Sequence, residues 1–101
     1  MEDLELRKKE FKDRLTNELF IERYDSFKES IILINMALES FRIDYQYTYD
    51  QFCIDYTNEC MEYMDNHPDV DMMDPTQLYF YTLPIVMSIV EKAKNKYGIK
   101  K

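Results

Sequence analysis

The residues best suited to chemistry in this sequence are the acids and tyrosines between residues 39 and 74. This segment carries ten Asp and Glu residues against a single base, Arg42, so its net charge is -9, whereas that of the whole chain is -7. Such a segment repels nucleic acid and anionic membranes and attracts basic proteins. We therefore expect a binding surface for a basic partner protein, made of Asp44, Tyr45, Tyr47, Tyr49, Asp50, Asp55, Glu59, Glu62 and Asp65.

A row of carboxylates on a helix can imitate nucleic acid. Side chains at positions i, i+4 and i+7 repeat about every 5–6 Å along the helix axis. Phosphates of one DNA strand repeat about every 3.4 Å along the duplex axis and lie farther apart through space. The acids could therefore occupy a basic groove built for nucleic acid, with exposed tyrosines as rigid anchors. In the alternative interpretation, the acids are only solvated and the tyrosines cap the core.

A second cluster of acids surrounds the only histidine. Oxygen-rich loops bind calcium, but an EF-hand loop needs a central Gly and a distal Glu, and this loop has neither. One His and two Cys on a separate element do not make a closed zinc site. Turn formation and helix capping account for the cluster, so we expect no metal and no cofactor. Its members are Asp65, His67, Asp69, Asp71 and Asp74.

Catalytic groups are sparse in this sequence. A nucleophile needs a base and an orienting group in contact with it, and His67 is the only histidine in the chain. Asp55 and Glu59 fall close together on a predicted helix, but nothing apolar surrounds both to separate their pKa values. The single Gly excludes a phosphate-binding glycine loop. We therefore expect a protein that is not an enzyme.

The two cysteines indicate a reducing compartment. Cys53 and Cys60 lie seven residues apart, which is about 10 Å along one helix. A disulfide needs Cα atoms within about 7 Å, so we expect two free thiols. The charged residues 1–10 do not resemble a signal peptide, and no apolar run is long enough to cross a bilayer. These features predict a cytoplasmic protein that does not bind membranes.

Composition predicts the elements that must hold the acids in place. The chain has 101 residues, 46% of them hydrophobic, with one Gly and three Pro. That is enough for one domain with its own core and leaves little material for hairpins. We predict an all-α, single-domain helical bundle over residues 1–101, with three to four helices around a long central helix at about 17–43.

The central helix rests on a heptad-like stripe with steps of four and three residues. Ile31 to Ile34 widen this stripe, which predicts a helix buried nearly all round. The stripe is longer than one small partner helix needs, so it could form a homodimer seam or be covered within the chain. Its members are Phe20, Tyr24, Phe27, Ile31, Ile34, Leu38, Phe41 and Tyr45.

A shorter helix precedes the central one over residues 2–15. Its apolar stripe is out of phase with the later stripe by about one residue. Thr16 and Asn17, two poor helix formers, lie at the mismatch. Either the helix breaks there or it continues with a local shift of its seam.

Capping signals place two further helices. Residues 43–49 alternate apolar and polar, which fits a connection or a tail of the central helix. Thr48 and Gln51 form a capping box for a helix over 49–66, with Asp55, Glu59 and Glu62 as an exposed stripe. His67-Pro68 ends that helix. Asp74, Pro75 and Gln77 then begin a last helix, in which Pro84 predicts a kink or break and Gly98 fits the C-terminal cap.

Together these patterns favour an interaction protein. We expect a small regulator or inhibitor that binds a basic, nucleic-acid-handling protein through its acidic, Tyr-rich surface, as a DNA mimic would. A small acidic chain of this kind fits a product of a phage or mobile element. The alternative is a structural or assembly subunit that acts by forming homo-oligomers through its apolar helix.

Overall fold

A computed structural model of the chain describes residues 2–72 and 74–99, and helices account for most of them. The predicted all-α helical bundle is therefore confirmed. Across the described residues, extended pairing is limited to an isolated antiparallel bridge between Ile43 and Ile99. The elements are α1 (Glu2–Arg14), a π-helical turn η1 (Leu15–Leu19), α2 (Phe20–Glu22), α3 (Tyr24–Ser40), α4 (Tyr49–Asn66) and α5 (Pro75–Lys96).

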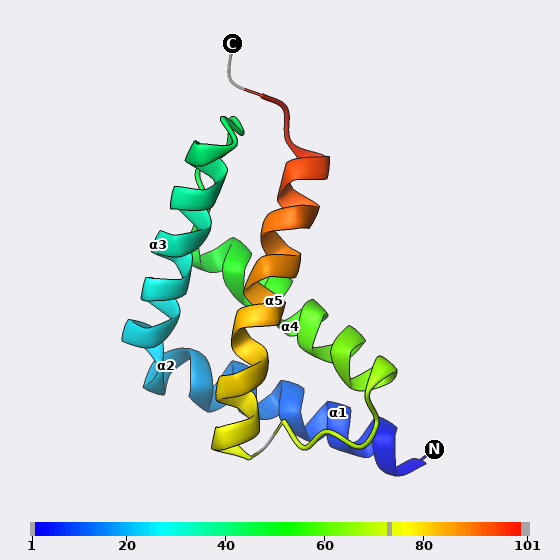
Figure 1. The fold of residues 1–101 in the computed structure, drawn as a ribbon. Coiled ribbons are helices and arrows are strands. Elements are labelled where there is room, and N and C mark those ends of the chain that lie inside the picture. Colours follow the sequence, from blue (N-terminus) through cyan, green and yellow to red (C-terminus); the bar gives the residue numbers. More distant parts are fainter. Residues whose placement is uncertain (1, 73, 100–101) are drawn as a thin grey trace.

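The helices cross in two layers. Helices α3 and α5 lie side by side and run in the same direction, while α4 crosses behind them and α1 runs antiparallel to α4 (Figure 1). Helix α4 contacts α1, α3 and α5, so it occupies the centre of the bundle. The stretch predicted to be the central helix, 17–43, instead forms one edge of the front layer.

The predicted 17–43 helix is divided at two places. The π-helical turn η1 contains Thr16 and Asn17, so of the two alternatives the chain continues as a helix with a local shift of its seam. A π-helical turn takes up one extra residue, which keeps Leu15 and Leu19 on the buried side. The second division is at Arg23, where φ is -106° and ψ is 25°, and where the chain turns from α2 into α3 (Figure 1). Ser26 and Glu29 have the spacing of a capping box that could start a helix, but the unbroken stripe argued against a start there, and the turn lies three residues earlier.

Helix α3 buries one stripe rather than its whole circumference. Phe27, Ile31, Ile34 and Leu38 are buried, as the stripe predicts. Ile32 and Leu33 are more than half exposed, so the expectation of a helix buried nearly all round is wrong. The helix lies at the edge of the bundle, where neighbours cover only one side of it.

The end of α3 is a Schellman motif built around Arg42. The amide of Ile43 donates to the carbonyl of Leu38 at 2.8 Å, and that of Arg42 to the carbonyl of Glu39 at 3.0 Å. Arg42 has a φ of 58°, the left-handed conformation that glycine usually supplies there. Residues 43–49 therefore connect α3 to α4 and do not extend the helix.

The predicted caps of α4 and α5 are largely confirmed. Thr48 Oγ1 accepts from the amide of Gln51 at 3.2 Å, and Asp74 Oδ1 accepts from the amide of Thr76 at 2.9 Å. Gln77, predicted to complete the second capping box, accepts from the amide of Asp71 instead. Helix α5 passes through Pro84 without a break.

The chain end after α5 returns to the end of α3. The amide of Asp44 donates to the carbonyl of Gly98 at 2.7 Å, beside the Ile43–Ile99 bridge. Gly98 follows the last helical turn as predicted, but its φ is not positive, so it is not a left-handed cap. Within the described ranges, each helix is too short or too polar to cross a bilayer.

Candidate functional site

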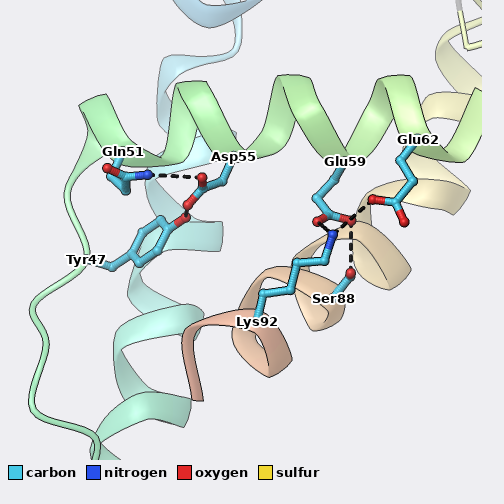
Figure 2. A network of polar contacts seen from close by, with 7 residues as sticks. All are labelled: Tyr47, Gln51, Asp55, Glu59, Glu62, Ser88 and Lys92. Carbon is cyan, nitrogen blue, oxygen red and sulfur yellow. Dashed lines mark hydrogen bonds and ion pairs between the residues drawn. The ribbon is translucent and has the colours of Figure 1, made fainter. Parts of the chain in front are cut away.

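Two of the predicted acids on α4, Glu59 and Glu62, point toward Lys92 of α5 (Figure 2). We call Asp55, Glu59, Glu62 and Asp65 the α4 acid row. Asp55 accepts a short hydrogen bond from the hydroxyl of Tyr47 and a second one, at 3.0 Å, from Nε2 of Gln51. Burial raises the pKa of Tyr47, and the carboxylate of Asp55 raises it further.

Glu59 lies at the centre of the row and is only 9% exposed, so its predicted place on an exposed stripe is wrong. Nζ of Lys92 lies 2.5 Å from its Oε1, and the hydroxyl of Ser88 donates to its Oε2 at 2.9 Å. Lys92 also contacts Glu62 at 2.9 Å (Figure 2). Hydrogen bonds to these two carboxylates raise the pKa of Lys92. One lysine of α5 therefore holds two acids of the row.

Asp65, the last acid of the row, pairs with α1. Nζ of Lys8 lies 2.7 Å from its Oδ1, and this hydrogen bond raises the pKa of Lys8. Nearby, Arg7 donates to the carbonyl of Pro68 at 2.5 Å. Every member of the α4 acid row thus has a partner inside the molecule, which leaves less negative charge free for a foreign basic groove.

The three predicted tyrosine anchors are also engaged. Tyr47 is 3% exposed, so the expectation that it is exposed is wrong. Tyr45 stacks on Tyr97 with ring centres 3.8 Å apart, and its pKa is raised by a hydrogen bond to Tyr97 and by burial. The hydroxyl of Tyr49 donates to the carbonyl of Phe20 at 2.6 Å, and burial raises its pKa to about 12. Among the other candidates, Asp44 and Asp50 are exposed.

A small cleft of about 220 Å³ lies between α4 and α5. Asp55, Glu59, Lys92 and Tyr97 line it. Glu59 forms an ion pair with Lys92, whereas Asp55 accepts hydrogen bonds from uncharged side chains. The pKa shifts of Tyr47 and Lys92 both favour the forms these groups already hold at neutral pH. The arrangement fits a network that holds α4 against α5 better than a set of groups tuned to exchange protons.

The thiols and the acidic loop offer little further chemistry. Cys53 and Cys60 are free, as predicted, and burial raises the pKa of both thiols, which disfavours the reactive thiolate. Over residues 2–72 and 74–99, His, Cys, Asp and Glu do not gather in groups of three or more that could hold a metal ion.

The surface that sequence reasoning missed is apolar. Seven large hydrophobic side chains of α3 and α5 are between 55% and 76% exposed. On α5 they recur at intervals that place them on one side of the helix, opposite its buried residues. We call this surface the α3–α5 face: Ile32, Leu33, Met36, Tyr79, Phe80, Leu83 and Met87.

A groove runs through the α3–α5 face. Its volume is about 460 Å³, with buried Phe27 and Val86 at its floor and Leu33, Phe80 and Leu83 among its walls. Farther along the two helices, outside the groove lining, Nζ of Lys94 lies 3.8 Å from the centre of the Phe41 ring. The groove therefore has an apolar floor, and polar side chains complete its walls.

The signal for this face was present in the sequence. Helix α5 needs only its buried positions, such as Ile85, Ile89 and Ala93, to close the core. Tyr79, Leu83 and Met87, spaced four residues apart, form a second apolar stripe on the same helix. A count of apolar residues on both sides of the helix would have shown more of them than the core needs.

Comparisons with protein-family models, with curated proteins and with solved structures find no match to this chain.

Proposed function

We propose that this chain is a small protein-interaction module that binds a basic partner protein through the α3–α5 face. The observation that carries the proposal is the exposure of seven large apolar side chains on these two helices, four of which line one groove. Contiguous apolar patches beyond a few hundred Å² are uncommon on monomeric proteins and mark binding surfaces. Tyr79 and Phe80 alone present roughly 250 Å².

Aromatic side chains suit this role. Interfaces draw most of their affinity from a few large anchors near their centre, among which aromatic residues are enriched. Tyr79 and Phe80 lie at the edge of the groove with ring centres 6.2 Å apart. Burial of either side chain against a partner would contribute about 1.5–3 kcal/mol.

Charge favours a basic partner. The chain carries a net charge of -7, and helix α5 has no base between Pro75 and Glu91. A basic protein would approach faster than a neutral one and would meet few cations on this surface. Such a module would act as a regulator or inhibitor, because it offers its partner a docking surface and no reactive group.

The proposal is tested by capture from an extract of the cells that carry the gene, with two matched variants as bait. The double variant Phe80→Ser/Leu83→Ser removes the centre of the α3–α5 face without changing the charge. The double variant Glu62→Gln/Asp65→Asn removes two exposed acids of the α4 acid row. We expect the first variant to lose the protein that the natural chain retains, and the second to keep it.

The opposite pattern would support a second candidate function. If the acid variant loses the partner and the apolar variant keeps it, the chain binds through its acids, as a nucleic-acid mimic would. The exposure of Asp44 and Asp50 favours this candidate. Asp44→Asn/Asp50→Asn would then lose the partner as well. Circular dichroism at each step verifies that the variants fold.

A third outcome would point to assembly. If sedimentation velocity shows a dimer of the natural chain that Phe80→Ser/Leu83→Ser disperses, and no other protein is captured, the chain is a homo-oligomeric subunit. That result would overturn the proposal of a foreign partner while leaving the α3–α5 face as the contact surface.

A further inference from the structure

We infer that the α3–α5 groove recognises an amphipathic helix whose polar side is basic, an inference that rests on the proposed function of the α3–α5 face. Helices α3 and α5 run side by side in the same direction, and the groove lies between them (Figure 1). A pair of adjacent helices with apolar walls is the usual receptor for a third helix laid into the groove.

Backbone chemistry selects a helix over an extended peptide. The groove is walled by helices, whose own backbone groups are paired except where Pro84 removes the usual helical donor to the carbonyl of Phe80. An extended peptide buried there would leave its amides and carbonyls without partners, at a cost of about 1–3 kcal/mol for each buried group. Strand addition would need an exposed sheet edge, and the described chain has only the isolated Ile43–Ile99 bridge. A helix satisfies its own backbone and can enter an apolar groove.

The length of the face sets the ligand's pattern. Tyr79 and Met87 are eight residues apart on α5, which is about 12 Å along the helix. Apolar side chains at i, i+4 and i+7 of a ligand helix span about 10 Å. The groove volume of about 460 Å³ has room for side chains of this kind. We therefore expect three apolar anchors over two turns of the ligand.

The charges beside the groove favour lysine and arginine around those anchors. Glu29 lines the groove, and Asp25, four residues earlier on α3, lies on the same side of the helix. Both are exposed. Among the residues that line this groove, Glu29 is the one acid and Arg23 the one base, and Asp25 adds a second acid beside the lining. A ligand with basic flanks would pair with the two acids, whereas an acidic ligand would be repelled.

Charge also disfavours the other occupants of an apolar face. A second copy of the chain would bring the same net charge of -7 and the same acids to the contact. An anionic membrane would be repelled for the same reason, since membrane-surface helices are rich in Lys and Arg. A basic helix from another protein is the occupant that both the apolar groove and its charges accept.

The test uses synthetic peptides and the full chain. A fluorescein-labelled 15-residue Leu/Lys peptide with leucines at i, i+4 and i+7 is titrated with the protein, and anisotropy is recorded. A Leu/Glu peptide of the same pattern tests the charge, and a scrambled Leu/Lys peptide of the same composition tests the amphipathic arrangement. We expect binding of the first peptide only.

Two protein variants locate the binding. Phe80→Ser/Leu83→Ser keeps the net charge, so we expect at least a tenfold weaker affinity from lost apolar contact alone. Asp25→Asn/Glu29→Gln should weaken binding several-fold at low salt, and high salt should abolish that difference. Both pairs are exposed, so thermal melts are expected to match those of the natural chain.

Each contrary result overturns a specific part of the inference. Equal binding of the scrambled peptide, or an unchanged affinity of Phe80→Ser/Leu83→Ser, would mean attraction by charge alone and no helix recognition. Tighter binding of the Leu/Glu peptide would overturn the basic ligand. A dimer that Phe80→Ser/Leu83→Ser disperses would make a second copy the occupant.

The inference and the proposed function can fail separately. If the Leu/Lys peptide does not bind but Phe80→Ser/Leu83→Ser still loses a captured protein, the helical ligand is wrong and the binding face stands. If that variant keeps its captured protein, the proposed function itself is wrong.

Discussion

Helix α5 has two contrasting sides: one packs against α4 with its polar side chains paired, and the other, beside α3, has exposed apolar side chains. Toward α4, Lys92 and Ser88 meet the buried carboxylate of Glu59, and every acid of the α4 acid row has a partner within the molecule. On the other side, Tyr79, Phe80 and Leu83 are more than half exposed. The acids of the α4 side are thus paired inside the molecule, whereas these apolar groups are left exposed.

This difference shows that residue type alone does not reveal which surface of a small helical protein is free to bind. The charged side suggests a binding surface by composition, but the fold gives each of its acids a partner, and Lys8 and Lys92 offset part of its negative charge. The apolar side suggests a core by composition, but none of the helices in the described residues covers it. The two sides therefore respond differently to changes that attack hydrogen bonds and changes that attack apolar contact.

Alkaline pH should cause the largest loss of unfolding free energy, through buried tyrosines on the α4 side. Burial raises the pKa of Tyr47 and Tyr56 in the folded chain above the ordinary value near 10. As pH rises, the unfolded chain loses these protons before the folded chain does. The free energy of unfolding is therefore highest below pH 10 and falls as pH rises through and beyond that value. Above pH 10, each tyrosine that stays neutral in the folded chain lowers the free energy of unfolding by about 1.4 kcal/mol per pH unit. Urea unfolding at pH 8, 10 and 11 measures the fall.

Matched tyrosine variants assign that fall to the buried network. Tyr47→Phe removes one of the titrating groups and should make the dependence on pH shallower. Tyr79→Phe, on the exposed side, should leave it unchanged. An identical slope in both variants would show that Tyr47 does not carry the effect.

Reversal of charge at Glu59 should be the next largest effect. Glu59→Lys would place a second cation beside Lys92 in a nearly buried position and remove the acceptor for Ser88. We expect a loss of about 2–3 kcal/mol of unfolding free energy by chemical denaturation. Glu62→Lys, one turn away and exposed, should cost less than about 1 kcal/mol. Similar losses in the two variants would contradict the central position of Glu59.

The smallest effect is expected at Arg42, which lies at the end of α3 and belongs to neither of the two sides of α5 compared above. Arg42→Gly relieves the left-handed backbone at the end of α3, where φ is 58°. We expect a gain of about 0.5–1 kcal/mol in unfolding free energy, because strain falls while the unfolded chain gains some freedom. A thermal melt measures it, and peptide binding at the α3–α5 face should not change. A loss of stability would mean that the Arg42 side chain contributes more than its backbone costs.

Local chemistry made much of the fold predictable. The caps at Thr48 and Asp74 act over two or three residues, so the bounds of α4 and the start of α5 could be inferred from the sequence. The mismatch at Thr16 and Asn17 was also visible as a change of phase between two stripes. The turn at Arg23 has no such signature, because tertiary packing determines it.

The candidate site was harder to predict. The burial of Glu59 depends on Lys92 and Ser88, which lie on another helix, and no spacing within α4 reveals them. The stacking of Tyr45 on Tyr97 likewise joins the segment that follows α3 to the residue that follows α5. Sequence patterns predict which side of one helix is apolar, but not how many neighbours remain to cover it.

The π-helical turn η1 gives the chain a place where its length can change. An α-helix advances about 100° per residue, so removal of one residue between Leu15 and Leu19 would restore the regular pitch. The first helix would then swing through about that angle and carry Phe11 and Lys8 away from α4. The turn therefore sets the rotation of the first helix, and a chain shortened at this point would have to rebuild its contacts with α4.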